Sequence, residues 1–76
     1  MNSSTTTASI TILVNDQART FLAGASLAEV VSTLGLAERK GIAAAVNGAV
    51  VPRREWPARL LGEGDRVLVI QATQGG

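Results

Sequence analysis

The last two residues of the sequence, Gly75 and Gly76, are the ones best suited to chemistry. Glycine has no side chain, so an extended diglycine can pass through a narrow channel that any larger residue would block. Such a tail would carry the carboxylate of Gly76 into the active site of another protein. The alternative is a flexible chain end without a chemical role.

A carboxylate must be activated before a nucleophile can attack it. If the Gly76 carboxylate attacked the α-phosphorus of ATP, an acyl-adenylate would form in a partner that supplies Mg²⁺ and cationic groups. Sulfur attack on this adenylate would leave a C-terminal thiocarboxylate, a donor of sulfide equivalents. We therefore expect Gly76 to be modified and Gly75 to thread the channel beside it. ATP and Mg²⁺ are then used by the partner, and this chain itself binds no cofactor.

The remaining composition disfavours an enzyme that works alone. The sequence contains no histidine and no cysteine, which removes the commonest general base near neutral pH and the commonest zinc ligands. It also lacks a phosphate-binding loop, so we predict no catalytic residue and no metal site. The net charge of +1 is too small for a nucleic-acid surface. No apolar run reaches the roughly 18 residues that span a bilayer. The expectation is a cytoplasmic protein that binds neither nucleic acid nor membrane.

One short amphipathic helix is the clearest local pattern. Ser26 and Glu29 have the spacing of a capping box. Gly35 is suited to end the helix in the left-handed conformation. Between them, apolar residues follow the spacing i, i+3, i+4 and i+7, which places them on one face: Leu27, Val30, Val31 and Leu34. We predict a helix over residues 27–34 that must pack on a sheet, because it is too short to be stable alone.

Five strands are predicted around this helix. Asn15-Asp16 and Asn47-Gly48 are hairpin turn signals between runs of strand-forming residues, and we assign Asn47-Gly48 turn chemistry alone. The predicted strands cover residues 10–14, 17–22, 42–46, 49–51 and 67–70. The segment 53–61 has no clear pattern.

This order of elements predicts a single α+β domain over residues 9–76, a mixed sheet with one main helix on one face. Residues 1–8, rich in Ser and Thr, are predicted to be a disordered leader, and the Gly-Gly end a flexible tail.

The uncovered face of the sheet is expected to be unusually apolar. If Val67 and Val69 face the helix, strand alternation points Leu68 and Ile70 away from it, and Leu13 likewise. An exposed apolar patch usually marks a partner surface. The alternative is that the segment 53–61 folds over this face.

Several motifs resemble the thiamine-biosynthesis sulfur carrier family, ThiS, and the resemblance covers nearly all of residues 10–76. The most specific is Val51-Pro52-Arg53-Arg54-Glu55-Trp56, whose Val-Pro-Arg-x-x-Trp string points to this branch of the ubiquitin-like proteins. The others are Val14-Asn15-Asp16-Gln17, Ala45-Val46-Asn47-Gly48, and Gly64-Asp65 with the apolar run before Gly75-Gly76.

The resemblance implies a ubiquitin-like β-grasp fold and a carrier on which partner enzymes act. A ThiF-type adenylating enzyme would activate Gly76, and a sulfur donor such as a cysteine desulfurase system would supply the sulfur. The thiocarboxylate would then donate it to a thiazole synthase of the ThiG type.

Two other functions remain open at this point. The small subunit of molybdopterin synthase resembles the same fold and uses the same tail, but tends to have an aromatic-Pro-Pro segment where this sequence has residues 70–74. A plain ubiquitin-like binding module would dock a partner and never be adenylated. Among other residues, Trp56 is expected to pack over the sheet edge rather than bind a partner. Arg53 and Arg54 are expected either in a solvated loop or against an acidic patch of the adenylating enzyme.

Overall fold

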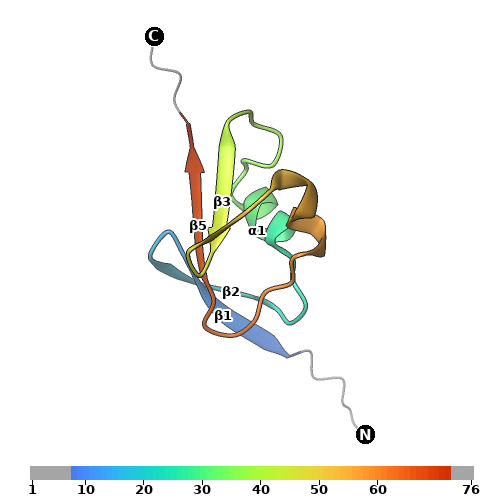
Figure 1. The fold of residues 1–76 in the computed structure, drawn as a ribbon. Helices are drawn as coiled ribbons and strands as arrows, with labels where there is room; N and C mark the ends of the chain where they lie inside the picture. Colours follow the sequence, from blue (N-terminus) through green and yellow to red (C-terminus); the bar gives the residue numbers. More distant parts are fainter. Residues whose placement is uncertain (1–7, 73–76) are drawn as a thin grey trace, which may run out of the picture.

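A computed structural model describes residues 8–72, which form a five-stranded mixed sheet with two short helices (Figure 1). The strands are β1 (Ser9–Val14), β2 (Gln17–Leu22), β3 (Ile42–Val46), β4 (Ala49–Val51) and β5 (Arg66–Gln71). The helices are α1 (Leu27–Thr33) and the 3₁₀ helix η1 (Arg53–Ala58). All five predicted strands are present.

The strands lie in the order β2-β1-β5-β3-β4, so β5, the last strand in sequence, is central. It runs parallel to β1 and antiparallel to β3, and the two hairpins β1–β2 and β3–β4 flank it. The β1–β2 pairing extends one residue into the predicted leader, since the carbonyl of Ala8 accepts a hydrogen bond from the N–H of Ala23 at 2.9 Å. The other leader residues, 1–7, lie outside the described part of the chain.

Both predicted ends of α1 are confirmed, with one residue's difference. Ser26 Oγ accepts from the N–H of Glu29 at 3.2 Å, and Glu29 Oε1 accepts from the N–H of Ser26 at 2.9 Å. At the other end the helix stops at Thr33, and Leu34 is its C-cap. Gly35 then adopts a φ of 77°, which lets the N–H of Leu36 bond back to Val31 at 3.2 Å. This Schellman-type closure is what ends the helix before Leu34.

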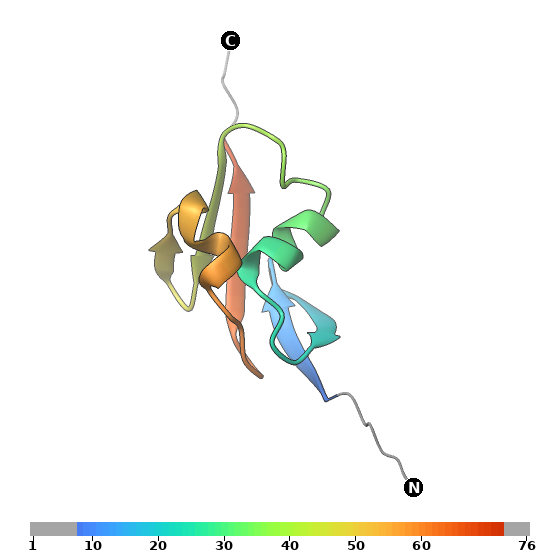
Figure 2. The same ribbon diagram turned by 90° about the vertical axis from the view of Figure 1, so that its right-hand side faces the viewer.

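The core lies between one face of the sheet and the two helices. Its residues come from alternate positions of the strands, from the apolar stripe of α1 and from η1: Ile12, Val14, Leu27, Val30, Val31, Ala44, Val46, Trp56, Val67 and Val69. Figure 2 shows α1 and η1 side by side on this same face. The segment that begins at Arg53 therefore does not fold over the opposite face, and that alternative is wrong.

Among residues 8–72, neither α1 nor η1 has the length or the apolar character that a bilayer-spanning helix needs.

Candidate functional site

The predicted reactive residues, Gly75 and Gly76, lie outside the described residues, so the site is built from the strand that leads to them. The last described residue, Ala72, donates its N–H to the carbonyl of Gly41 at 2.8 Å. The chain is thus tied to the sheet until four residues before Gly76.

The face of the sheet opposite α1, here called the open face, carries the predicted apolar residues of β5. Leu68 is 52% exposed and Ile70 54%, whereas Val67 and Val69 are buried in the core. The predicted orientation of Leu68 and Ile70 is therefore confirmed. Leu13 of β1 lies on the same side but is half-buried.

A shallow apolar depression runs across β4, β3 and β5 on the open face. The strand registers place Val50 opposite Ala45 and Ala45 opposite Leu68. In the next row Ala43 lies opposite Ile70. Because alanine is smaller than its neighbours, the two alanines form a floor between larger side chains. This depression is lined entirely by apolar residues.

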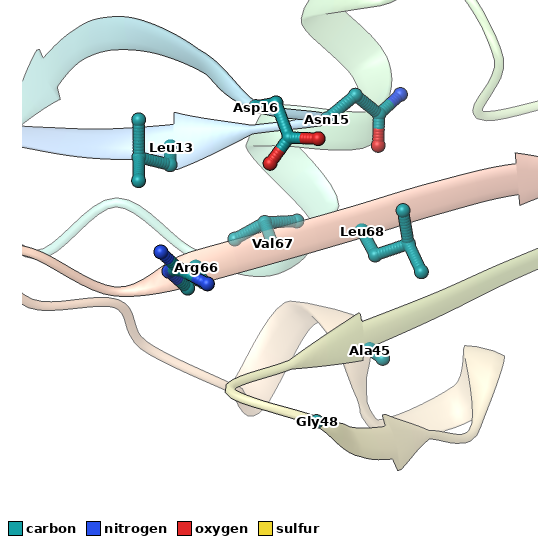
Figure 3. Close-up of a pocket in the computed structure, with 8 residues that line it drawn as sticks. All are labelled: Leu13, Asn15, Asp16, Ala45, Gly48, Arg66, Val67 and Leu68. Atoms are coloured by element: carbon teal, nitrogen blue, oxygen red, sulfur yellow. The ribbon is translucent and has the colours of Figure 1, made fainter.

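A second depression adjoins the first and has polar groups at its rim. Figure 3 shows Leu13 and Leu68 along its length, with Arg66 and Asp16 beside them. Ala45 and Leu68 line both depressions, so the two form one continuous surface. Such a surface can accept apolar side chains of a partner and pair with polar groups at the Arg66 and Asp16 end.

Two turn asparagines bind β5 through their side chains, a role that the sequence reasoning missed. Asn15 and Asn47 are each the first residue of a two-residue hairpin turn, and both have a φ of 51°. Asn15 Oδ1 accepts from the N–H of Val69 at 2.8 Å, and its Nδ2 donates to the Val69 carbonyl at 3.1 Å. Asn47 Oδ1 accepts from the N–H of Arg66 at 2.9 Å. The assignment of Asn47-Gly48 to turn chemistry alone is therefore incomplete.

Asp65 lies at the start of β5 in the same network as Asn47. The N–H of Gly62 donates to its Oδ2 at 2.8 Å, and Asn47 Nδ2 donates to its Oδ1 at 3.0 Å. These two hydrogen bonds, that of Gly62 first, lower the pKa of the Asp65 carboxyl because they stabilise the ionised form. The Asp65 carboxylate thus links the start of β5 to the turn between β3 and β4.

Trp56 and Arg53 form a structural unit within the chain. Trp56 is buried as predicted, and its Nε1 donates to the carbonyl of Val51 at 2.9 Å. The Arg53 guanidinium lies 4.8 Å from the centre of the indole ring. It donates to the carbonyls of Ala37 at 2.8 Å and Arg39 at 2.6 Å. Arg53 and Arg54 are both exposed, as predicted for a solvated segment, although they lie in η1 and the Arg53 guanidinium is also bonded to the loop that follows α1. Contact with an acidic patch of the adenylating enzyme stays a prediction.

Metal ions in proteins are commonly bound by groups of His, Cys, Asp and Glu side chains. Within residues 8–72, no three such side chains lie together in a way that could hold a metal ion. The described residues thus provide an apolar surface suited to binding and a strand that leads, along the sequence, to a Gly-Gly end.

These features define a small ubiquitin-like β-grasp protein, and similar structures agree. The crystal structure of the thiamine biosynthesis protein ThiS from Geobacter metallireducens superimposes with a TM-score of 0.73, at 25% identity, over 88% of this chain and 100% of that one. A solution structure of a thiamine biosynthesis protein from the same organism gives a TM-score of 0.71, also at 25% identity, over 88% of each chain.

Sequence comparison gives the family. The model of the ThiS family matches residues 12–76. The sulfur carrier protein ThiS of Escherichia coli K12 is 37% identical over 65 residues, which cover 86% of this chain and 97% of that protein. The chain belongs to the ThiS family.

Proposed function

We propose that this protein is a cytoplasmic sulfur carrier of thiamine biosynthesis and that the carboxylate of Gly76 is its working group. The observation that carries the proposal is that one strand, β5, bears the apolar open face and leads directly to the Gly-Gly end. Membership of the ThiS family supports the same conclusion.

The proposed chemistry has two steps at Gly76, both in partner enzymes. In a ThiF-type adenylating enzyme, a carboxylate oxygen attacks the α-phosphorus of ATP, and pyrophosphate leaves with Mg²⁺ stabilising its charge. A sulfur nucleophile from a donor such as a cysteine desulfurase system then attacks the acyl carbon. AMP leaves, and when the sulfur comes from a persulfide the product is an acyl disulfide that links the donor to the acyl group of Gly76. A thiol then reduces this disulfide, is itself oxidised to a disulfide with the donor's sulfur, and leaves a thiocarboxylate at the end of the chain. A thiazole synthase of the ThiG type receives the sulfur.

Chain length limits where the adenylating site can lie. Four residues follow Ala72, and a fully extended chain of four spans at most about 14 Å. The partner must therefore bind next to the end of β5. Ile70 lies only two residues before Ala72 and is 54% exposed on the open face, so this face is within the required distance.

The proposed occupant of the open face is the adenylating enzyme. The surface from Val50 through Leu68 to Leu13 offers apolar contact area, and Arg66 and Asp16 offer a pair of opposite charges at one end. Apolar area supplies affinity in such an interface, while charges at its rim set orientation. Docking there would hold the end of β5, from which the last residues continue, close to the nucleotide.

Intact mass spectrometry of the chain purified from thiamine-producing cells tests the proposal. We expect a fraction of molecules with one oxygen exchanged for one sulfur, localised to Gly76 by fragmentation. The matched control carries one extra residue after Gly76 and should remain unmodified. If the chain stays unmodified even with an adenylating enzyme, ATP, Mg²⁺ and a sulfur source, the carrier proposal is wrong and a plain binding module replaces it.

A further inference from the structure

The side chain of Asn15 replaces backbone pairing at a point where β1 ends. β1 pairs with β5 up to Val14 opposite Val67, and the N–H of Asn15 donates to the Val67 carbonyl at 2.9 Å. The chain then turns into β2 with a φ of 51° at Asn15. The Asn15 carboxamide continues the pairing, because it binds both the N–H and the carbonyl of Val69.

This contact lies close to the origin of the tail. In Figure 3 the Asn15 side chain extends from the end of β1 in the direction in which β5 runs. Val69 is three residues before Ala72. We call residues 69–72 the tail root. On the edge that faces β1, the tail root is hydrogen-bonded at Val69 by the side chain of Asn15, which lies 54 positions earlier in the sequence.

The other edge of the tail root pairs with β3 over residues 69–71 and, at Ala72, with the loop that follows α1. Gly41 accepts the N–H of Ala72 and has a φ of 75°. A Cβ at position 41 would lie 3.2 Å from the Ala72 carbonyl oxygen, so the two backbones approach closely. Earlier in this loop, Ala37 and Arg39 are bonded by Arg53, which stacks on the buried Trp56. The tail root is thus connected to the core on one edge and to the β1–β2 turn on the other.

We propose that Asn15 is a positioning residue for the adenylation of Gly76. By fixing Val69 it sets the direction in which the last residues leave the sheet, so that a docked chain presents its carboxylate to the nucleotide. This proposal rests on the proposed carrier function. Without the Asn15 carboxamide the tail root is held on its β3 edge alone. The backbone freedom that it gains would have to be removed in each productive encounter, and ordering the backbone of one residue is worth roughly tenfold in an equilibrium.

Asn47 is a matched control within the same strand. It has the same φ of 51°, opens the same kind of turn, and its carboxamide also binds the N–H of a β5 residue. Its contacts, however, are with Arg66 at the start of β5 and with Asp65 just before it, at the end away from the tail. Glycine suits both positions, because it adopts positive φ without strain. Asn15→Gly and Asn47→Gly therefore each remove one carboxamide from β5 and retain the turn.

These two variants, Asn15→Asp and the wild type are compared by amide hydrogen exchange and by ATP–pyrophosphate exchange with a ThiF-type enzyme that adenylates the wild-type chain. Urea denaturation gives the free energy of unfolding of each. We expect Asn15→Gly to lose protection at the amides of the tail root and to lower kcat/KM for adenylation by about tenfold. Asn47→Gly should leave kcat/KM within about twofold of the wild type. Asn15→Asp, which keeps the turn and an acceptor for Val69 but loses the donor, should show the same defect.

The outcomes separate the possible explanations. If both glycine variants lose adenylation in proportion to their free energies of unfolding, Asn15 is only structural and the positioning proposal is wrong. It is also wrong if Asn15→Gly and Asn15→Asp are adenylated like the wild type. Failure of the wild-type chain itself, with every ThiF-type enzyme tried, overturns the carrier function instead. In that case exchange at the tail root still shows whether Asn15 fixes it.

Discussion

Replacing Leu68 with aspartate tests whether the open face binds the adenylating enzyme, and the structure fixes the size of the expected effects. Leu68 is 52% exposed, so folding of the free domain buries only about half of its surface. Full burial of a leucine side chain is worth about 1.5–3 kcal/mol. The substitution should therefore cost the fold about 1 kcal/mol. A domain of ordinary stability, about 5 kcal/mol or more, stays folded after such a loss.

The complex should suffer more than the fold. Binding would bury the exposed half of Leu68, and its loss removes about another 1 kcal/mol of apolar contact. The new carboxylate would also be desolvated against Ala45 and Val50, which offer it no hydrogen bond. A combined loss of at least about 2 kcal/mol corresponds to a Kd for the adenylating enzyme raised at least about 30-fold.

Titration calorimetry with the adenylating enzyme measures this Kd, and circular dichroism melts monitor the fold. The matched control is Leu60→Asp, because Leu60 is 57% exposed and lies next to Ser26 at the start of α1, away from the open face. Leu60→Asp should bind like the wild type. An unchanged Kd for Leu68→Asp would refute the assignment of the open face, and unfolding of this variant would show that the burial argument underestimates Leu68.

Three further predictions follow from the tail, the core and the entry to β5. Gly76→Ala should keep the fold but slow adenylation, because its methyl group crowds a channel that fits glycine, as pyrophosphate exchange would show. Trp56→Ala should lower the free energy of unfolding by about 3–5 kcal/mol, measured by urea denaturation followed by circular dichroism, because it empties a buried site. The lowered pKa of Asp65, due first to the Gly62 N–H, means that ionised Asp65 stabilises the fold above its unfolded pKa. This stabilisation should vanish as the pH falls through the folded pKa, and Asp65→Asn should remove that part of the acid dependence in denaturation curves taken below about pH 4.

Local patterns were sufficient to predict the helix and strands. The capping box at Ser26 and Glu29 and the two turn signals each act within a few residues, so their outcome is set by short-range chemistry. The exposure of Leu68 and Ile70 followed from strand alternation once the buried face was assigned.

Long-range contacts explain what the sequence could not show. The role of Asn15 depends on Val69, its partner 54 positions later, and a turn asparagine looks the same with or without that partner. The segment that begins at Arg53 forms η1, and its Trp56 is buried in the core beside α1. The local sequence pattern of this segment does not indicate which face of the sheet it covers. Arg53 could be assigned to its carbonyl partners only when the loop after α1 was in place.

Because β1 and β5 are parallel neighbours, the start of β1 and the end of β5 lie at opposite ends of the sheet (Figure 1). Each strand has six residues, so the start of β1 and the end of β5 are separated by roughly 20 Å or more. A purification tag, a surface linker or a whole fused domain placed before Ser9 therefore stays clear of the end of β5. The same addition after Gly76 would replace the carboxylate with an amide and disable it. If Gly76 is adenylated as proposed, a protein immobilised through its N-terminal end should still be modified in place.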